Sequence, residues 1–181
     1  MLGTSKEIKN PGLNILPPGV ERHVVNGGAL TAFQIFPDDE LEIINNEGNQ
    51  ICEIICFNKD GKSDVGILNL KSNNDKNFIR SILNGKDETI LATNHQLKKR
   101  NLNISDSKSS IIFDLDTKAG ESFKLKSKDK CYAIFAAPSE DMDVTNQNPP
   151  SDLTIFIKRS QIVNDKELNV IPDPVFEPLY E

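Results

Sequence analysis

The residues in this sequence best suited to chemistry are three cysteines and two histidines: Cys52, Cys56, Cys131, His23 and His95. Cys52 and Cys56 fall within one apolar run that has the character of a β-strand. Positions four apart on a strand are separated by roughly 13 Å, whereas a zinc ion holds thiolates at about 2.3 Å. The same separation excludes a disulfide between them, since a disulfide needs Cα atoms within about 7 Å. We therefore interpret both as small buried hydrophobic residues.

The two histidines offer little support for a metal site. His23 and His95 are far apart in the sequence, and neither stands in an HxH, HxxxH or HxxE arrangement. With Cys131 they could form a mixed site, but an exposed or locally bonded histidine is the simpler interpretation. Cys131 could also approach Cys52 or Cys56 across strands, and the sequence leaves open which. We predict that the chain binds no stoichiometric zinc or iron and carries no cofactor of its own.

Other signatures of catalysis are absent from the sequence, which contains no GxSxG, Walker or GxGxxG pattern. The acidic residues form two short runs, at residues 38–40 and 139–141. Adjacent side chains on a strand point to opposite faces, so neither run makes a paired carboxylate site. We interpret both runs as surface turns and predict no catalytic residue in this chain.

The composition narrows the possible partners. The formal net charge is −6 and the pI is about 5.0, which disfavours the phosphate neutralisation that drives nucleic-acid binding. We interpret the one basic cluster, Lys98-Lys99-Arg100, as a solvated loop. No apolar stretch approaches the roughly 20 residues that span a bilayer, and residues 1–13 have no secretory leader pattern. Together with an odd number of cysteines, these features predict a cytoplasmic protein.

Apolar runs separated by turn residues predict a mostly β fold, a twisted antiparallel β-sandwich or barrel-like domain with one short helix. The runs 50–57 and 131–137 are almost uninterruptedly apolar, which predicts central strands. A hairpin is expected around residues 45–49. The helix is expected at residues 75–84, capped by Asp75 and ended by Gly85 in the left-handed conformation. Further strands are expected at residues 21–25, 29–36, 88–92, 109–115, 122–125 and 153–158.

The chain is expected to have three parts: an extended lead-in at residues 1–20, a β domain at residues 21–160 and a Pro-rich strap at residues 161–181 that leads to a following domain. Three prolines within residues 172–178 exclude a helix or a central strand there. The apolar residues around them are too many for a purely solvated linker. We therefore predict that deleting residues 172–181 leaves the melting temperature nearly unchanged and abolishes association with a partner.

Asp152 is the acidic residue for which the sequence predicts a specific structural role. It follows Pro149-Pro150, where the chain cannot continue a strand ladder and must turn. An aspartate at such a junction commonly accepts hydrogen bonds from backbone amides that the turn leaves unpaired. We expect this role rather than contact with a ligand.

Two stretches resemble a known family. Gly48-Asn49-Gln50, followed by Glu53, resembles the G-N-Q-x-x-D strand of the urea-carboxylase-associated family. Residues 136–141 and 148–159 are similar to the end of the variant of that family that precedes glycine-cleavage T-protein-like, folate-dependent aminomethyltransferases. The likeness extends from Glu21 to the C-terminus. It singles out as motif residues Gly48, Asn49, Gln50, Glu53, Pro138 and Asp152.

The sequence departs from the family pattern at positions that the family's metal-dependent chemistry would need. Ala137 stands at the family's cysteine position before Pro138, and Glu53 replaces the aspartate that follows G-N-Q. Alanine cannot bind a metal ion, whereas a thiolate can. The resemblance therefore implies a fold and a partner more directly than an activity.

The resemblance implies two functions. The first is a non-catalytic accessory module of an aminomethyltransferase-like one-carbon enzyme, with a role in assembly, packing or substrate gating. Its partner would be a T-protein-like transferase domain or subunit, and tetrahydrofolate would bind to that partner. The alternative is a small enzyme of the urea-carboxylase-associated type that acts on guanidine or urea derivatives. In that enzyme His23, His95, Glu53 and a cysteine would converge.

Overall fold

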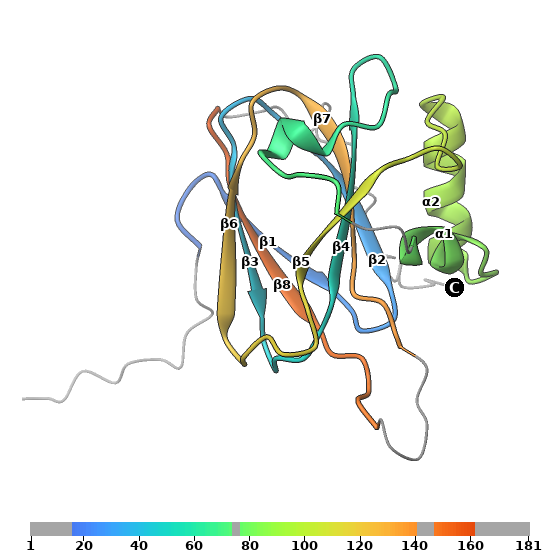
Figure 1. The fold of residues 1–181 in the computed structure, drawn as a ribbon. Helices are drawn as coiled ribbons and strands as arrows, with labels where there is room; N and C mark the ends of the chain where they lie inside the picture. Colours follow the sequence, from blue (N-terminus) through green and yellow to red (C-terminus); the bar gives the residue numbers. More distant parts are fainter. Residues whose placement is uncertain (1–15, 74–76, 141–146, 162–181) are drawn as a thin grey trace, which may run out of the picture.

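A computed structural model describes residues 16–73, 77–140 and 147–161, and residues 162–181 of the expected strap lie outside the described part. Within these residues there are eight strands and two α-helices (Figure 1). In chain order the elements are β1 (Val20–Val25), β2 (Leu30–Ile35), β3 (Glu40–Asn45), β4 (Cys52–Asn58), the 3₁₀-helix η1 (Val65–Leu68), α1 (Phe78–Leu83), α2 (Glu88–Lys99), β5 (Ser109–Phe113), β6 (Glu121–Lys126), β7 (Cys131–Ala136) and β8 (Leu153–Lys158). No described helix has the length and apolar character needed to cross a membrane.

The strands form two four-stranded antiparallel sheets that pack face to face. Sheet A has the order β1-β8-β3-β6, and sheet B has the order β2-β7-β4-β5. Consecutive strands therefore alternate between the sheets, except for β4 and β5, which pair directly in sheet B, and this is the arrangement of a double-sheet jelly roll. The expected mostly β fold is confirmed, as a β-sandwich of two separate sheets rather than a closed barrel.

The main core lies between the two sheets. Phe33 from β2, Ile54 from β4 and Phe135 from β7 are fully buried there, against Ile43 and Ile155 of sheet A. The outer face of sheet B carries a second cluster that includes Ile55, Phe57 and Ile134, and the α1–α2 segment covers it (Figure 1). Sheet B is thus buried on both faces, whereas the outer face of sheet A has no such helical cover among the described residues.

The two strands predicted to be central do lie inside sheet B. β4 is flanked by β7 and β5, and β7 is flanked by β2 and β4. Every residue of β7 is buried, and only the last residue of β4 is partly exposed. Their unbroken apolar runs therefore reflect burial on both faces of the sheet.

The expected hairpin around residues 45–49 is wrong. β3 pairs with β6 and β8 in sheet A, whereas β4 pairs with β5 and β7 in sheet B, so the turn carries the chain from one sheet to the other. The two strands also differ in the pattern of their buried residues. In β3 buried residues alternate with exposed or partly exposed ones, which fits a sheet with one solvated face, while β4 is buried in all but its last residue.

The helical segment also differs from the expectation. Asp75 lies outside the described residues, and α1 begins after Asn77, whose side-chain Oδ1 accepts a hydrogen bond from the Arg80 amide. The helix is closed by Asn84 in the right-handed conformation, and Gly85 does not have a positive φ. The stop that we predicted from the left-handed conformation of glycine is therefore wrong.

The predicted strand at residues 88–92 is in fact the first half of the longer helix α2. Ile90, Thr93 and Leu97 recur at helical spacing and face the sheet, whereas Leu91 is 55% exposed. A five-residue window was too short to distinguish this spacing from a strand. The basic cluster that we expected in a loop occupies the last turn of this helix, where positive charge is favoured by the helix dipole.

Candidate functional site

The motif residue Gln50 joins three loops at one end of the sandwich. Its side chain is buried, and its Nε2 donates to the carbonyl of Pro138 at 3.0 Å, while its Oε1 accepts from the amide of Ser151 at 2.7 Å. Its own carbonyl accepts from Nδ2 of Asn45 at 2.8 Å. All of these partners belong to the protein, so the amide of Gln50 ties loops together rather than presenting a free group to a ligand.

Gly48 and Asn49 shape the turn that precedes Gln50. Gly48 has φ +80°, and a Cβ at this position would lie 2.8 Å from the carbonyl oxygen of Thr117 and 2.7 Å from the amide nitrogen of Ala119. The amide of Asn49 donates to the same Thr117 carbonyl at 2.8 Å. Glycine is required here by both the backbone angle and the close approach of the neighbouring chain.

Asp152 lies at the same end of the molecule. Its Oδ1 accepts a hydrogen bond from the amide of Gly27 at 2.9 Å, and its carbonyl accepts from Nδ2 of Asn46 at 3.1 Å. The amide that Asp152 binds therefore belongs to the turn between β1 and β2, not to its own turn. The motif residues Gly48, Asn49, Gln50, Pro138 and Asp152 thus meet in one group of loops.

Glu53 is the motif residue that lies elsewhere. It sits in β4 on the face that α1 covers, is fully buried, and accepts a hydrogen bond from the amide of Ile79 at 2.7 Å. This amide belongs to the first turn of α1, where backbone donors have no partner within the helix. Glu53 therefore fixes the short helix to the sheet.

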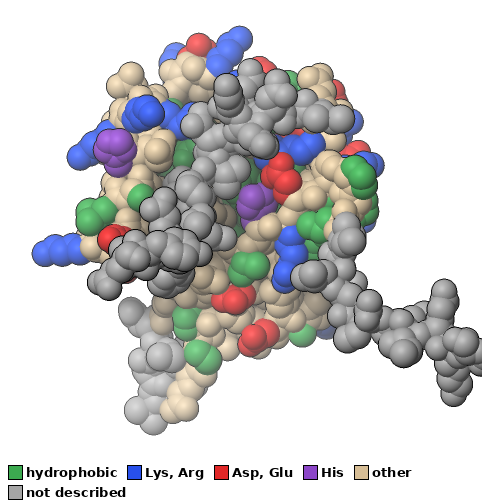
Figure 2. All heavy atoms as spheres, turned by 180° about the vertical axis from the view of Figure 1, so that it is seen from behind, with side chains coloured by type: hydrophobic (Ala, Val, Ile, Leu, Met, Phe, Trp, Pro, Cys, Tyr) green, Lys and Arg blue, Asp and Glu red, His purple; other side chains and the backbone are tan. Residues whose placement is uncertain are grey.

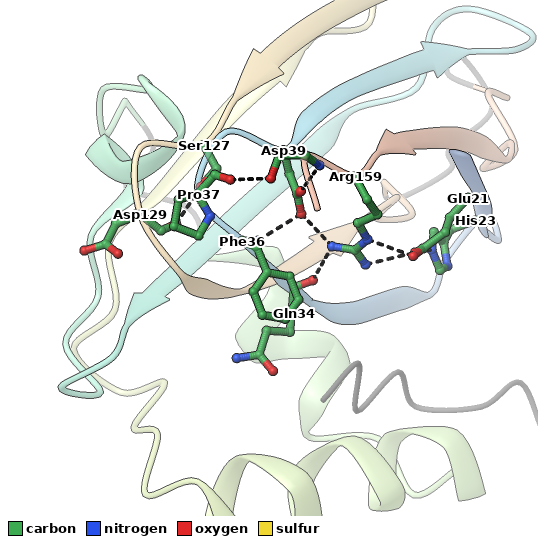
Figure 3. Close-up of polar contacts among 10 residues, drawn as sticks. Glu21, His23, Gln34, Phe36, Pro37, Asp39, Ser127, Asp129 and Arg159 are labelled. Atoms are coloured by element: carbon green, nitrogen blue, oxygen red, sulfur yellow. Dashed lines mark hydrogen bonds and ion pairs between the residues drawn. The ribbon is translucent and has the colours of Figure 1, made fainter. Parts of the chain in front are cut away.

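A buried charged cluster at the opposite end of sheet A was not expected from the sequence (Figure 3). Arg159 follows β8, and its guanidinium is 4% exposed. Its Nε and Nη2 donate to the two carboxylate oxygens of Glu21 at 2.7 and 2.9 Å. Its Nη1 donates to Oδ2 of Asp39 at 2.7 Å and to the carbonyl of Gln34 at 2.9 Å. One guanidinium thereby connects β1, β2, β8 and the turn before β3.

Asp39 corrects our interpretation of residues 38–40 as a surface turn. Its neighbours Asp38 and Glu40 have exposed side chains, but Asp39 itself is fully buried. Its carboxylate also accepts from the amides of Phe36 and Ser160, each at 2.9 Å. Burying a carboxylate is tolerated when charged and hydrogen-bonding partners surround it, and Asp39 has both.

The ionisation of this cluster argues against acid–base chemistry near neutral pH. Burial alone raises the pKa of Glu21, but hydrogen bonds from His23 and Arg159 outweigh it and lower that pKa to about 2. Burial disfavours the charged form of Arg159, yet its bonds to Glu21 and Asp39 raise its pKa above the ordinary value. The Glu21 carboxylate is therefore too weak a base, and the Arg159 guanidinium too weak an acid, to exchange protons efficiently at neutral pH. The cluster instead holds the surrounding strands together through its ion pairs.

The three candidate metal ligands are not brought together. His23 lies on β1, where its Nε2 is 3.0 Å from Oε2 of Glu21 and its ring stacks on Phe33 with centroids 4.8 Å apart. His95 is exposed on α2, and Cys131 is buried at the start of β7. Among the residues that the structure describes, no group of three or more His, Cys, Asp or Glu side chains could hold a metal ion.

The cysteine contact that the sequence left open is between Cys56 and Cys131. Both thiols are free and buried, and a hydrogen bond between them, together with burial, raises the pKa of Cys56 well above its usual range. Burial also raises the pKa of Cys52. The thiolate is the reactive and metal-binding form, so Cys52 and Cys56 stay protonated and inert at neutral pH.

A large cavity lies along sheet A near its edge strand β6. It has a volume of about 830 Å³ and is lined mainly by Val20, Phe123, Phe156 and the aliphatic chains of Lys124 and Lys158. Phe123 is 36% exposed, which is unusual for so large an apolar side chain. We call this cavity the sheet A groove. Elsewhere, on the described part of the face seen in Figure 2, acidic and basic side chains are interspersed, as on an ordinary solvated surface.

No family model matches the sequence. The chain is similar to trimethylamine-oxide aldolase of Ruegeria pomeroyi, with 30% identity over 172 residues. The matched region is 95% of this chain but 22% of that protein, so the chain spans about a fifth of the length of this curated relative. The resemblance to urea-carboxylase-associated proteins stays a prediction. The similarity shows that nearly the whole β-sandwich chain has a counterpart within a larger enzyme.

Proposed function

We propose that this chain acts as a non-catalytic β-sandwich module of a larger one-carbon enzyme with an aminomethyltransferase-like catalytic part. The observation that carries the proposal is the similarity to one segment of trimethylamine-oxide aldolase, which covers 95% of the chain and 22% of that protein. The substrate of the whole enzyme would then be a methylated amine or amine oxide. Tetrahydrofolate, if used, would bind to the transferase part rather than to this module.

The buried polar side chains bind other groups of the protein, which supports a non-catalytic role. Gln50, Glu53 and Asp39 are all buried, and each binds backbone groups of the protein itself. Arg159 is held by two carboxylates. Groups committed in this way fix loops and helices, and releasing them for a substrate would leave buried partners unpaired.

The sheet A groove is the surface through which we expect the module to contact the transferase part. Its apolar floor contains Phe123 and Phe156, and its rim carries charges of both signs, including the Lys124–Glu42 pair at 3.8 Å. Most of the trimethylamine-oxide aldolase chain lies outside the matching segment, so a module of this kind has a large neighbour to contact. Interfaces between domains of one enzyme have this mixture of apolar and polar surface.

The test is direct binding of the purified chain to a T-protein-like aminomethyltransferase by sedimentation velocity or calorimetry. Phe156→Ser removes an aromatic contact from the groove and should weaken binding at least about tenfold, as loss of a central aromatic contact usually does. Val24→Ser is the matched control, because Val24 is 41% exposed on β1 and does not line the groove. Absence of any complex, or equal weakening by both variants, would contradict the proposal.

The alternative enzyme acting on guanidine or urea derivatives needs His23, His95, Glu53 and a cysteine to converge. Glu53 lies beneath α1, His95 is exposed on α2, and His23 is paired with Glu21 on β1. No observation on the described residues favours this function. Turnover of a guanidine or urea derivative by the chain alone, with about one metal ion per chain, would favour the alternative over the module.

A further inference from the structure

A second cavity lies where the end of α2 meets sheet B, away from the sheet A groove, and Gln34, whose carbonyl accepts a hydrogen bond from Arg159, forms part of its lining. It has a volume of about 340 Å³. Three basic residues line it, Lys59 from the loop after β4, Arg100 from the end of α2, and Lys130 from the residue before β7. No acidic residue lines it among the described residues. In a protein with a net charge of −6, every charged residue that lines this cavity is thus a cation, among neutral residues such as Gln34 and Asn58.

Arg100 is the central cation of this cavity. Its guanidinium lies over the ring of Tyr132, with the guanidinium carbon 4.6 Å from the ring centroid. Its Nε is buried and has no hydrogen-bond partner among the described residues, and no carboxylate there forms an ion pair with it. Arginine usually enters partly buried positions with a carboxylate or phosphate partner, because its planar fork matches those groups. Among the described residues, Arg100 thus has an aromatic partner but no anionic one.

Tyr132 forms the floor of the cavity. It is 5% exposed, and its buried hydroxyl has no hydrogen-bond partner among the described residues. Burial raises the pKa of this phenol, although the charge of Arg100 acts in the opposite direction. The phenol therefore keeps its proton at neutral pH and remains a donor. Buried polar groups are normally paired, so two unpaired groups beside one cavity indicate that a partner is missing.

The remaining polar groups around the cavity also favour an anion. Oδ1 of Asn58 accepts from the amides of Asp60 and Lys62 at 3.0 and 2.9 Å, which directs this acceptor away from the lining and leaves its NH₂ group as a donor. Lys59 and Lys130 are exposed residues of the lining, and the ammonium of Lys130 lies over the Phe36 ring, 5.1 Å from its centroid. Asp60 follows Lys59 in the sequence but does not line the cavity.

We propose that this cavity binds a small oxyanion with at least two negative charges, a phosphate or a di- or tricarboxylate, with Arg100 as its principal contact. The guanidinium would bind two oxygens of the ligand, and Lys59 and Lys130 would neutralise the remaining charge. The Tyr132 hydroxyl, which is buried and has no hydrogen-bond partner among the described residues, would be a further donor to the ligand. This site does not depend on the proposed role as an enzyme module, and it can be tested on the chain alone.

The first experiment measures thermal unfolding in phosphate and in citrate, each against sodium chloride at the same ionic strength. Wild-type protein should melt at a higher temperature in at least one of the two, and the ligand that acts identifies the source of the oxyanion. In ¹H–¹⁵N spectra the amide of Gly61, which lines the cavity, should shift with the same ligand. No stabilisation and no shift with either ligand would overturn the proposal.

The second experiment compares Arg100→Met with Lys98→Met. Both remove one positive charge at the end of α2, but Lys98 does not line the cavity. Arg100→Met should weaken binding at least about tenfold, which corresponds to the loss of one charge-assisted contact, while Lys98→Met should retain most of the affinity. Equal loss in both variants would show that only general charge attraction operates, and the site would then be rejected.

A third variant, Tyr132→Phe, distinguishes the contribution of the hydroxyl to ligand binding from its contribution to stability. It removes the unpaired buried oxygen, so the ligand-free protein should be at least as stable as wild type. Binding should weaken about threefold to tenfold, because the ligand loses one donor and keeps the guanidinium. Unchanged affinity in Tyr132→Phe would remove this residue from the site, and unchanged affinity in Arg100→Met would overturn the proposal as a whole.

Discussion

Arg159 and Arg100 are both partly buried, yet their surroundings differ in one decisive respect. Arg159 lies between the carboxylates of Glu21 and Asp39 and donates four hydrogen bonds. Arg100 lies over the ring of Tyr132 and lines a cavity to which the described part of the chain contributes no carboxylate. A buried guanidinium that the protein has already paired serves the fold, whereas one that lacks an anion is available for binding. The two residues can therefore be told apart by what each substitution does to stability.

The largest effect is expected at Arg159. Arg159→Met leaves Asp39 buried without its charged partner, and removing one member of a buried ion pair typically costs about 3–5 kcal/mol of the free energy of unfolding. Denaturant unfolding followed by circular dichroism measures this loss. Lys158→Met is the neighbouring control, because its ammonium is 70% exposed and 3.6 Å from Glu40. An exposed pair of this kind contributes about 0–1 kcal/mol. A similar loss for both variants would contradict the comparison.

The pH dependence of stability gives the next test of the paired cluster. The pKa of Glu21 is about 2 in the folded protein and 4.5 ordinarily, so the unfolded chain binds more protons between these values. Its contribution is therefore complete above about pH 5 and is lost as the pH falls toward 2. Glu21→Gln should flatten the acid side of the stability curve, measured by unfolding midpoints from pH 6 to 2. An unchanged slope would show that Glu21 is not stabilised by its partners.

A smaller effect is expected at Asp152, an exposed residue whose side chain accepts one hydrogen bond. Asp152→Ala frees the amide of Gly27 and should lower the free energy of unfolding by about 1 kcal/mol. Asp116→Ala is a suitable control, since Asp116 is exposed and its carboxylate takes part in none of the hydrogen bonds found in the described part of the chain. A normal melting midpoint for Asp152→Ala, with loss of binding to the transferase, would instead assign Asp152 to an interface.

The smallest effect on stability is expected at Arg100. Arg100→Met keeps an apolar chain over Tyr132 and breaks no ion pair, so the free energy of unfolding should change by no more than about 0.5 kcal/mol. Chemical unfolding in chloride alone, without oxyanions, is the appropriate measurement. A loss as large as that of Arg159→Met would mean that Arg100 has a structural role and would narrow the difference between the two arginines.

The sequence predicted a structural element correctly where the residues of one short stretch are enough to identify it. The apolar runs of β4 and β7 predicted their central positions, because burial on both faces removes alternation from a strand. The same kind of reasoning failed at residues 88–92, since the helical face of α2 appears only when Leu97 is included. It also failed at residues 45–49, where short apolar strands on both sides of a turn do not indicate whether they share a sheet.

The polar sites depend on contacts between distant parts of the chain, which the sequence does not contain. Asp39 looked like its exposed neighbours because its partner Arg159 is 120 positions away. Arg100 looked like part of a charged loop because Tyr132, the ring that it covers, lies on β7, 32 positions later in the sequence. Gln50 was identified through the resemblance, but its contacts with Pro138 and Ser151 were visible only in the fold. Distant pairing, rather than residue type, decides the role of each of these side chains.

The pairing of the first strand with the last has a consequence for engineering. Val20, at the beginning of β1, lies opposite Lys158, at the end of β8, so the two points where the sandwich connects to flanking chain are about one interstrand distance apart, roughly 5 Å. A short glycine-rich linker could join them, and the chain could be opened instead at Gly61, in the loop after β4. Such a circular permutant should keep the sandwich fold. The same geometry lets the unit be inserted into a loop of a host protein without forcing the two ends of that loop apart.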